Sequence, residues 1–63
     1  MYEFTGYIEE RSRSTFKTLN RVEVSVFAST PEDAKKKMEN LIVYPKDRSY
    51  IAVIMTSVRE VAQ

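Results

Sequence analysis

The sequence lacks cysteine and histidine, and both absences narrow the chemistry open to it. Without Cys there is no disulfide and no thiolate ligand, and without His the chain loses the commonest metal ligand and the usual general base at neutral pH. There is also no Gly-rich phosphate loop and no acidic cluster spaced for a metal ion. The carboxylates fall beside basic residues on expected exposed faces, where nothing tunes a pKa for acid–base work. We therefore expect a protein that is not an enzyme and that uses no cofactor, metal or small-molecule substrate.

The length and the charge of the chain further narrow the kinds of protein that it can be. A chain of 63 residues has room for one small core, and such a chain hides only about 60% of its unfolded surface. With no disulfide or metal to add stability, self-association is the remaining means. No apolar run approaches the ~20 residues of a membrane span, and the opening MYEFTGYIEE alternates and carries acids, unlike a signal peptide. We expect a cytoplasmic, intracellular protein that does not act at a membrane. Ten basic and nine acidic residues nearly cancel, so any electrostatic role depends on where the charges lie.

Hydrophobic periodicity predicts three strands and a helix. Residues 2–10 and 20–28 alternate apolar and polar side chains, which is typical of half-buried strands. Thr30 followed by Pro31 predicts a helix start, and Pro45 should end that helix near Val43, which gives a helix over 31–43. Residues 49–61 form the third expected strand. The sequence thus predicts a single α+β domain over 1–63 of ββαβ type, because a right-handed crossover leads to an antiparallel sheet of order 2-1-3 with the helix on one face.

The register of the expected hairpin follows from its apolar residues. They oppose one another only in one register, since a slip by one residue would turn every side chain over. The pairs in this register are Tyr2–Ala28, Phe4–Val26, Gly6–Val24, Ile8–Val22 and, on the other face, Glu9–Arg21. We expect that Gly6, which has no side chain, allows the helix to approach the first strand closely.

The same register predicts a two-stranded ribbon over residues 11–19, beyond the part covered by the helix. Its pairs would be Arg11–Leu19, Ser12–Thr18 and Arg13–Lys17, with a tip that lacks the Gly or Asn of favoured turns. Four basic side chains would then share the face away from the helix, and they are a candidate polyanion-binding set: Arg11, Arg13, Lys17 and Arg21. The alternative is an ordinary exposed ribbon whose charges prevent aggregation.

The third strand departs from simple amphipathicity. Ile51, Val53 and Met55 have one parity, whereas Tyr50, Ala52, Ile54 and Val58 have the other, so both faces are apolar over its first half. One helix can cover only one of these faces. Either another chain covers the second face, or a bulge switches faces within the strand, or these are scattered surface residues. The expected interface comprises Tyr7, Phe27, Ile54 and Val58.

These features favour a small, non-enzymatic binding or regulatory protein. It would act by protein–protein contact through the sheet face and the third strand, and a homodimer is the simplest arrangement. The alternative is nucleic-acid binding through the basic ribbon. In size, in its lack of Cys and His and in its compact ββαβ pattern, the chain is similar to small accessory proteins of bacteria and their phages, a likeness of style that assigns no residue a role.

Overall fold

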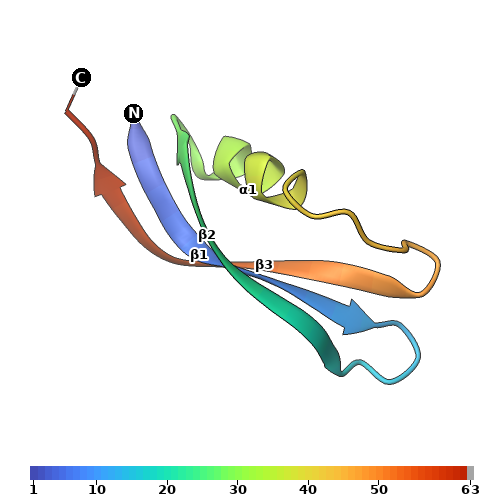
Figure 1. Cartoon of the computed structure of the whole chain (residues 1–63). Coiled ribbons are helices and arrows are strands. Elements are labelled where there is room, and N and C mark those ends of the chain that lie inside the picture. Colours follow the sequence, from blue (N-terminus) through green and yellow to red (C-terminus); the bar gives the residue numbers. More distant parts are fainter. Residues whose placement is uncertain (63) are drawn as a thin grey trace.

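The computed structural model describes residues 1–62, which form three strands and one helix. In chain order these are β1 (Tyr2–Ser12), β2 (Thr18–Ala28), α1 (Pro31–Glu39) and β3 (Ser49–Glu60). The strands form an antiparallel sheet in the order β2-β1-β3, with α1 on one face (Figure 1). The predicted α+β class, strand order and ββαβ sequence of elements are confirmed. Since β1 is central, β2 and β3 each have one edge without a neighbouring strand.

The hairpin register is confirmed from Tyr2–Ala28 to Glu9–Arg21 and changes beyond it. After Glu10 the pairing shifts so that Arg11 lies opposite Thr18, and the three pairs expected for the ribbon are wrong. The strands extend to Ser12 and Thr18, so the tip spans 13–17 and not 11–19. Phe16 closes the tip with a left-handed φ of 60°, the conformation that Gly or Asn would adopt at lower cost.

The helix begins as predicted and ends earlier. Thr30 accepts a hydrogen bond at its hydroxyl from the Asp33 N–H at 3.2 Å, and Pro31 occupies the first turn. The helix ends at Glu39, with Asn40 as its C-cap, and not at Val43. The reason is distance, because β3 must start opposite Ser12 at the far end of β1. Residues 40–48 leave the helix and span this distance in a non-helical conformation.

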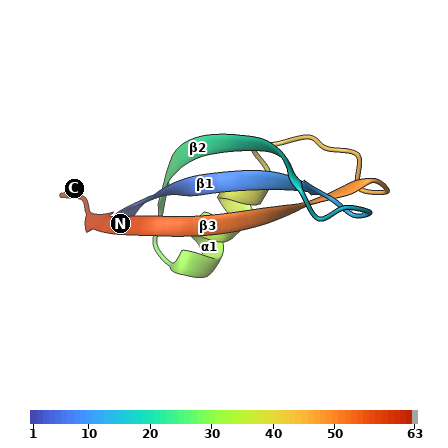
Figure 2. The same ribbon diagram turned by 90° about the horizontal axis from the view of Figure 1, so that it is seen from below.

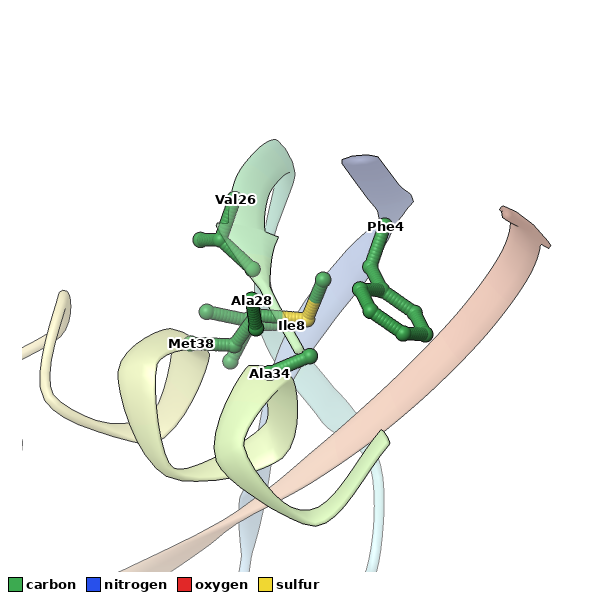
Figure 3. Close-up of a cluster of buried hydrophobic side chains, with 6 residues drawn as sticks. All are labelled: Phe4, Ile8, Val26, Ala28, Ala34 and Met38. Atoms are coloured by element: carbon green, nitrogen blue, oxygen red, sulfur yellow. The ribbon is translucent and has the colours of Figure 1, made fainter. Parts of the chain in front are cut away.

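The core lies between α1 and the nearer part of the sheet (Figure 3). It consists of Phe4 and Ile8 from β1, Val26 and Ala28 from β2, and Ala34 and Met38 from α1. All six side chains are buried. The four larger side chains, Phe4, Ile8, Val26 and Met38, each contribute roughly 1.5–3 kcal/mol relative to exposure, so a small cluster holds the helix on the sheet.

A bulge in β3 divides that strand into two parts. Thr5 pairs with Ser57, whereas Gly6 pairs with Met55, so Thr56 is an extra residue on β3. The Thr56 hydroxyl donates to the Thr5 carbonyl oxygen at 3.2 Å. A bulge of this kind reverses which face each later side chain occupies and increases the local twist.

Gly6 is needed at this bulge, and not by the helix as the sequence suggested. A Cβ at Gly6 would lie 2.1 Å from the Ile54 carbonyl oxygen and 2.9 Å from the Met55 Cα. Both are backbone atoms of β3. Only a residue without a side chain allows the two strands to pair here.

The molecule is elongated, with extents of 44 × 16 × 14 Å and a radius of gyration of 12.7 Å, against about 11 Å for a compact chain of this length. The sheet bends sharply part-way along its length, and α1 covers only one portion of it (Figures 1 and 2). Nine helical residues reach about 14 Å. The rest of the sheet extends away from the helix toward what we call the distal end, formed by residues 13–17 and 45–48.

We expect Gly6→Ala to lower the free energy of unfolding by about 3 kcal/mol, the upper end of the usual cost of overpacking, because the new Cβ overlaps backbone that has no rotamer to change. Urea denaturation followed by circular dichroism measures this effect. Thr5→Ala, an exposed neighbour, is the control and should change stability by less than about 1 kcal/mol. Equal stability of Gly6→Ala and the native protein would show that the bulge is not fixed by this contact.

Candidate functional site

The outer face of the sheet, which points away from α1, carries one compact apolar patch. Tyr7 lies opposite Ile54 on β3 and opposite Glu23 on β2, and both Tyr7 and Ile54 are half-buried. The Arg21 guanidinium lies 3.7 Å from the centre of the Tyr7 ring, a cation–π contact. We call Tyr7 and Ile54 the outer-face patch.

Phe27 lies on the same face but apart from this patch. It pairs with Glu3, four residues before Tyr7 along β1, and is 48% exposed. Its position near the end of an edge strand separates it from Ile54 by the width and part of the length of the sheet. Phe27 is therefore an isolated exposed residue in this structure.

Val58 was expected on the outer face, and the structure corrects this placement. Beyond the Thr56 bulge, Val58 lies opposite Phe4, on the α1 side of the sheet, and is 58% exposed. It lines a hollow of about 270 Å³ with Phe4, Pro31, Met55, Thr56 and Ser57. Of the four residues expected to form one interface, only Tyr7 and Ile54 are brought together.

The predicted basic set is largely engaged in contacts within the chain. Arg11 Nη2 lies 2.5 Å from Glu9 Oε1, and this hydrogen bond raises the pKa of the Arg11 guanidinium. Arg21 stacks on Tyr7, as described above. Lys17 lies in the tip, outside the strands, so strand pairing does not place it on the outer face.

Arg13 joins the hairpin tip to the chain that precedes β3. Its Nε donates to the Lys46 carbonyl oxygen at 2.8 Å and to the Ser49 carbonyl oxygen at 3.1 Å. Its backbone N–H donates to the Arg48 carbonyl oxygen at 2.9 Å, and its guanidinium lies 5.9 Å from the centre of the Tyr50 ring. Arg13 therefore has a structural role in addition to its charge.

The same junction is fixed by a buried serine. Ser49 is fully buried, and its hydroxyl donates to Glu10 Oε2 at 2.8 Å, which satisfies a polar group that would otherwise be costly to bury. The Ser49 N–H donates to the Pro45 carbonyl oxygen at 2.9 Å. The expected two-stranded ribbon is in fact three-stranded, because β3 pairs with β1 as far as Ser12–Ser49.

Two basic residues that the sequence reasoning missed lie at the distal end. The turn at 45–48 places Lys46 and Arg48 beside the tip that contains Arg13 and Lys17, with Asp47 as the single carboxylate of these two segments. Lys46 and Arg48 are both exposed. Extending the β1–β3 register to Ser12 would have revealed this clustering, whereas linear spacing does not.

A groove runs along the first part of the unpaired β3 edge. The chain from α1 to β3 lies beside β3, on the side away from β1 (Figure 1). Between them is a space of about 530 Å³, within the range of sites that hold small ligands. We call this space the edge groove; it is lined by Glu39, Asn40, Ile42, Val43, Tyr44, Lys46, Tyr50 and Ile51.

In residues 1–62, no group of three or more acidic side chains is placed to hold a metal ion. The described helix is too short and too polar to cross a membrane. No protein-family model, curated protein or solved structure matches the chain significantly. What the chain can do must therefore be inferred from its own surfaces.

The outer face also carries an ion pair that makes stability depend on pH. Arg59 donates to Glu3 Oε1 through Nε at 3.1 Å and Nη2 at 2.5 Å. This hydrogen bonding, with a smaller contribution from the Ser25 hydroxyl, lowers the pKa of Glu3. A lowered pKa in the folded state stabilises the fold above the ordinary Glu pKa, and this contribution is lost as the pH falls through the lowered value.

We expect Glu3→Gln to lower the melting temperature at neutral pH and to match the native protein once the pH is below the folded-state pKa of Glu3. Thermal unfolding at about pH 7 and about pH 2.5 tests this. Glu23→Gln, which removes one charge from the same face, is the control. A deficit for Glu3→Gln that is unchanged at low pH would contradict the assigned role of the ion pair.

Proposed function

We propose that this protein is a small, non-enzymatic binding protein that acts through contacts made by β3 and the outer face of the sheet. The observation that carries the proposal is the character of β3. Its residues from Ser49 to Val58 include no charged side chain, its outward edge has no neighbouring strand, and its first part is apolar on both faces. Natural proteins usually protect such edges with charge or cover.

The outer-face patch supports self-association as part of this function. α1 covers the opposite face, so Tyr7 and Ile54 have only neighbouring side chains such as Arg21 over them. A homodimer formed about a two-fold axis would bury the patch of each protomer against that of the other. It would also supply stability that a core of six buried apolar side chains provides only in part.

We expect Ile54→Asp to weaken self-association at least tenfold, because a charge buried in an interface without a partner is costly. Light scattering coupled to size-exclusion chromatography should give twice 7.4 kDa for the native protein and the monomer mass for the variant. Ser57→Asp places the same charge on the same strand and face, opposite Thr5, and should remain a dimer. A native protein that stays monomeric at high concentration would contradict self-association.

A second candidate function, nucleic-acid binding, is favoured by one observation at the distal end. The turn at 45–48 adds Lys46 and Arg48 to the basic tip, while Arg11 and Arg21, on which the alternative was first based, are engaged with Glu9 and Tyr7. The candidate phosphate contacts are thus moved from the outer face to the end of the molecule. Exposed Phe16 at the tip offers a ring on which a base can stack.

If the distal end binds phosphates, affinity for a labelled 20-nucleotide single strand should fall about 20-fold between 50 and 200 mM salt, for three contacts. Fluorescence anisotropy measures it. Lys17→Glu with Arg48→Glu should abolish binding, whereas Lys35→Glu with Lys36→Glu, on exposed helix positions, should weaken it only slightly. Binding that is insensitive to salt, or equal losses in both double variants, would exclude the distal end as the site.

A further inference from the structure

We propose that the edge groove binds an extended peptide segment of another protein, which adds as a strand to β3. This inference rests on the proposed binding function and names the chemistry of the partner. Addition of a strand to a sheet edge supplies affinity through backbone hydrogen bonds and selectivity through alternate side chains.

The first step is the direction of the β3 backbone groups. The Arg13 N–H donates to the Arg48 carbonyl oxygen, across the continuation of the Ser12–Ser49 register. Residues of an antiparallel pair alternate between directing both groups at the partner strand and directing both away. Ser49 therefore points away from β1, which agrees with its N–H donating to Pro45. By the same alternation Ile51, Val53 and Met55 direct their N–H and C=O groups to the free edge.

The second step is to find which of these edge-facing N–H and C=O groups have no hydrogen-bond partner. The edge-facing groups of Ser49 are already used, by Pro45 at the N–H and by Arg13 at the carbonyl oxygen. Ile51 is the first residue of the edge with no such contact in the part of the chain that the structure describes, and it lines the edge groove. A peptide would thus pair first with Ile51 and then with Val53.

The third step excludes a sheet as the occupant. If a second copy added its own β3 here, its β1 would follow one strand spacing, about 4.8 Å, farther out. Residues 42–46 form the wall of the groove that faces Tyr50 and Ile51, so a further strand beyond the added one would meet this wall. The groove therefore favours a single extended strand, and the partner we propose is a peptide segment and not a second copy of this sheet.

The charges at the two ends of the groove set the direction and chemistry of the peptide. Glu39 lies at the helix end and Lys46 at the distal end. A peptide antiparallel to β3 runs from Glu39 toward Lys46. A basic group near the start of the peptide would therefore meet Glu39, and an acidic group near its end would meet Lys46. Apolar side chains between them contact Ile42, Tyr44 and Ile51. The acidic group is a side chain or a terminal carboxylate.

The test uses an acetylated, amidated peptide, KTVTVE, and amide-shift titration of the intact protein by NMR. Shifts should centre on residues 42–46 and 51–53, and exchange of the Ile51 and Val53 amide protons should slow at least fivefold. The charge-reversed peptide ETVTVK should bind at least fivefold more weakly. A form of KTVTVE with a free carboxylate separates the two sources of acidity, because tighter binding assigns the site to chain termini and equal binding assigns it to internal segments.

Variants of the protein provide a second measurement. Ile51→Pro removes the edge N–H, which an edge strand tolerates, and should reduce peptide affinity at least fivefold. Val58→Pro is the matched control. Val61 N–H donates to Met1, so alternation makes Val58 also point to the free edge, but outside the groove. The variant Lys46→Glu, at an exposed position, should show a smaller preference for KTVTVE over ETVTVK than the native protein does. This measurement remains informative even if Ile51→Pro does not fold.

Three results would overturn the inference. Absence of shifts at 2 mM peptide, or shifts confined to the outer-face patch, would exclude the groove as the site. Concentration-dependent protection of Ile51 without peptide would show that a second copy occupies the edge. Each result is separate from the oligomer measurement, since a dimer formed through Ile54 leaves the groove free, and a monomer can still bind the peptide.

Discussion

The contact between Gly6 and the backbone of β3 is the constraint on which the rest of the structure depends. Because no Cβ stands at Gly6, the Ile54 carbonyl can approach β1 and the extra residue Thr56 can be accommodated. The resulting bulge turns Val58 to the α1 side while Ile54 stays on the outer face. It thereby separates β3 into two parts. The first part packs Ile51, Val53 and Met55 against the core and carries the edge groove and Ile54 of the outer-face patch, whereas the second part is exposed, with Val58 opposite Phe4.

The arginines show that basic residues grouped in the sequence can be engaged in contacts within the folded chain. In the sequence, Arg11, Arg13 and Arg21 look like free cations on one surface. In the structure each has a specific partner, namely a carboxylate, a pair of carbonyl oxygens and an aromatic ring. These contacts hold strands and loops together, and the remaining basic side chains of the distal end are Lys17, Lys46 and Arg48, of which Arg48 Nε lies 4.0 Å from the exposed Asp47 carboxylate.

Short sequence patterns predicted those features of the fold that are set by interactions between neighbouring residues. The hairpin register from Tyr2 to Glu9 followed from alternation, and the helix start followed from Thr30 and Pro31. The helix end did not, because the distance to the start of β3 sets it and that distance is a property of the whole sheet. The bulge was only one of several alternatives for β3, since no local residue type in β3 marks it. The edge groove and the clustering of Lys46 with Lys17 join segments far apart in sequence, and no spacing rule reveals them.

The central position of β1 has a consequence for synthesis of the chain. β1 is made first and pairs with β2 as soon as the hairpin emerges, but its second partner is β3, whose Glu60 pairs with Tyr2. Pairings of such separation form slowly, because a long loop must close before any contact forms. Until β3 has emerged from the ribosome, the second edge of β1 stays open, and Ser49 cannot reach Glu10. The nascent chain therefore exposes an unpaired central strand, the kind of surface that chaperones bind and that aggregation starts from.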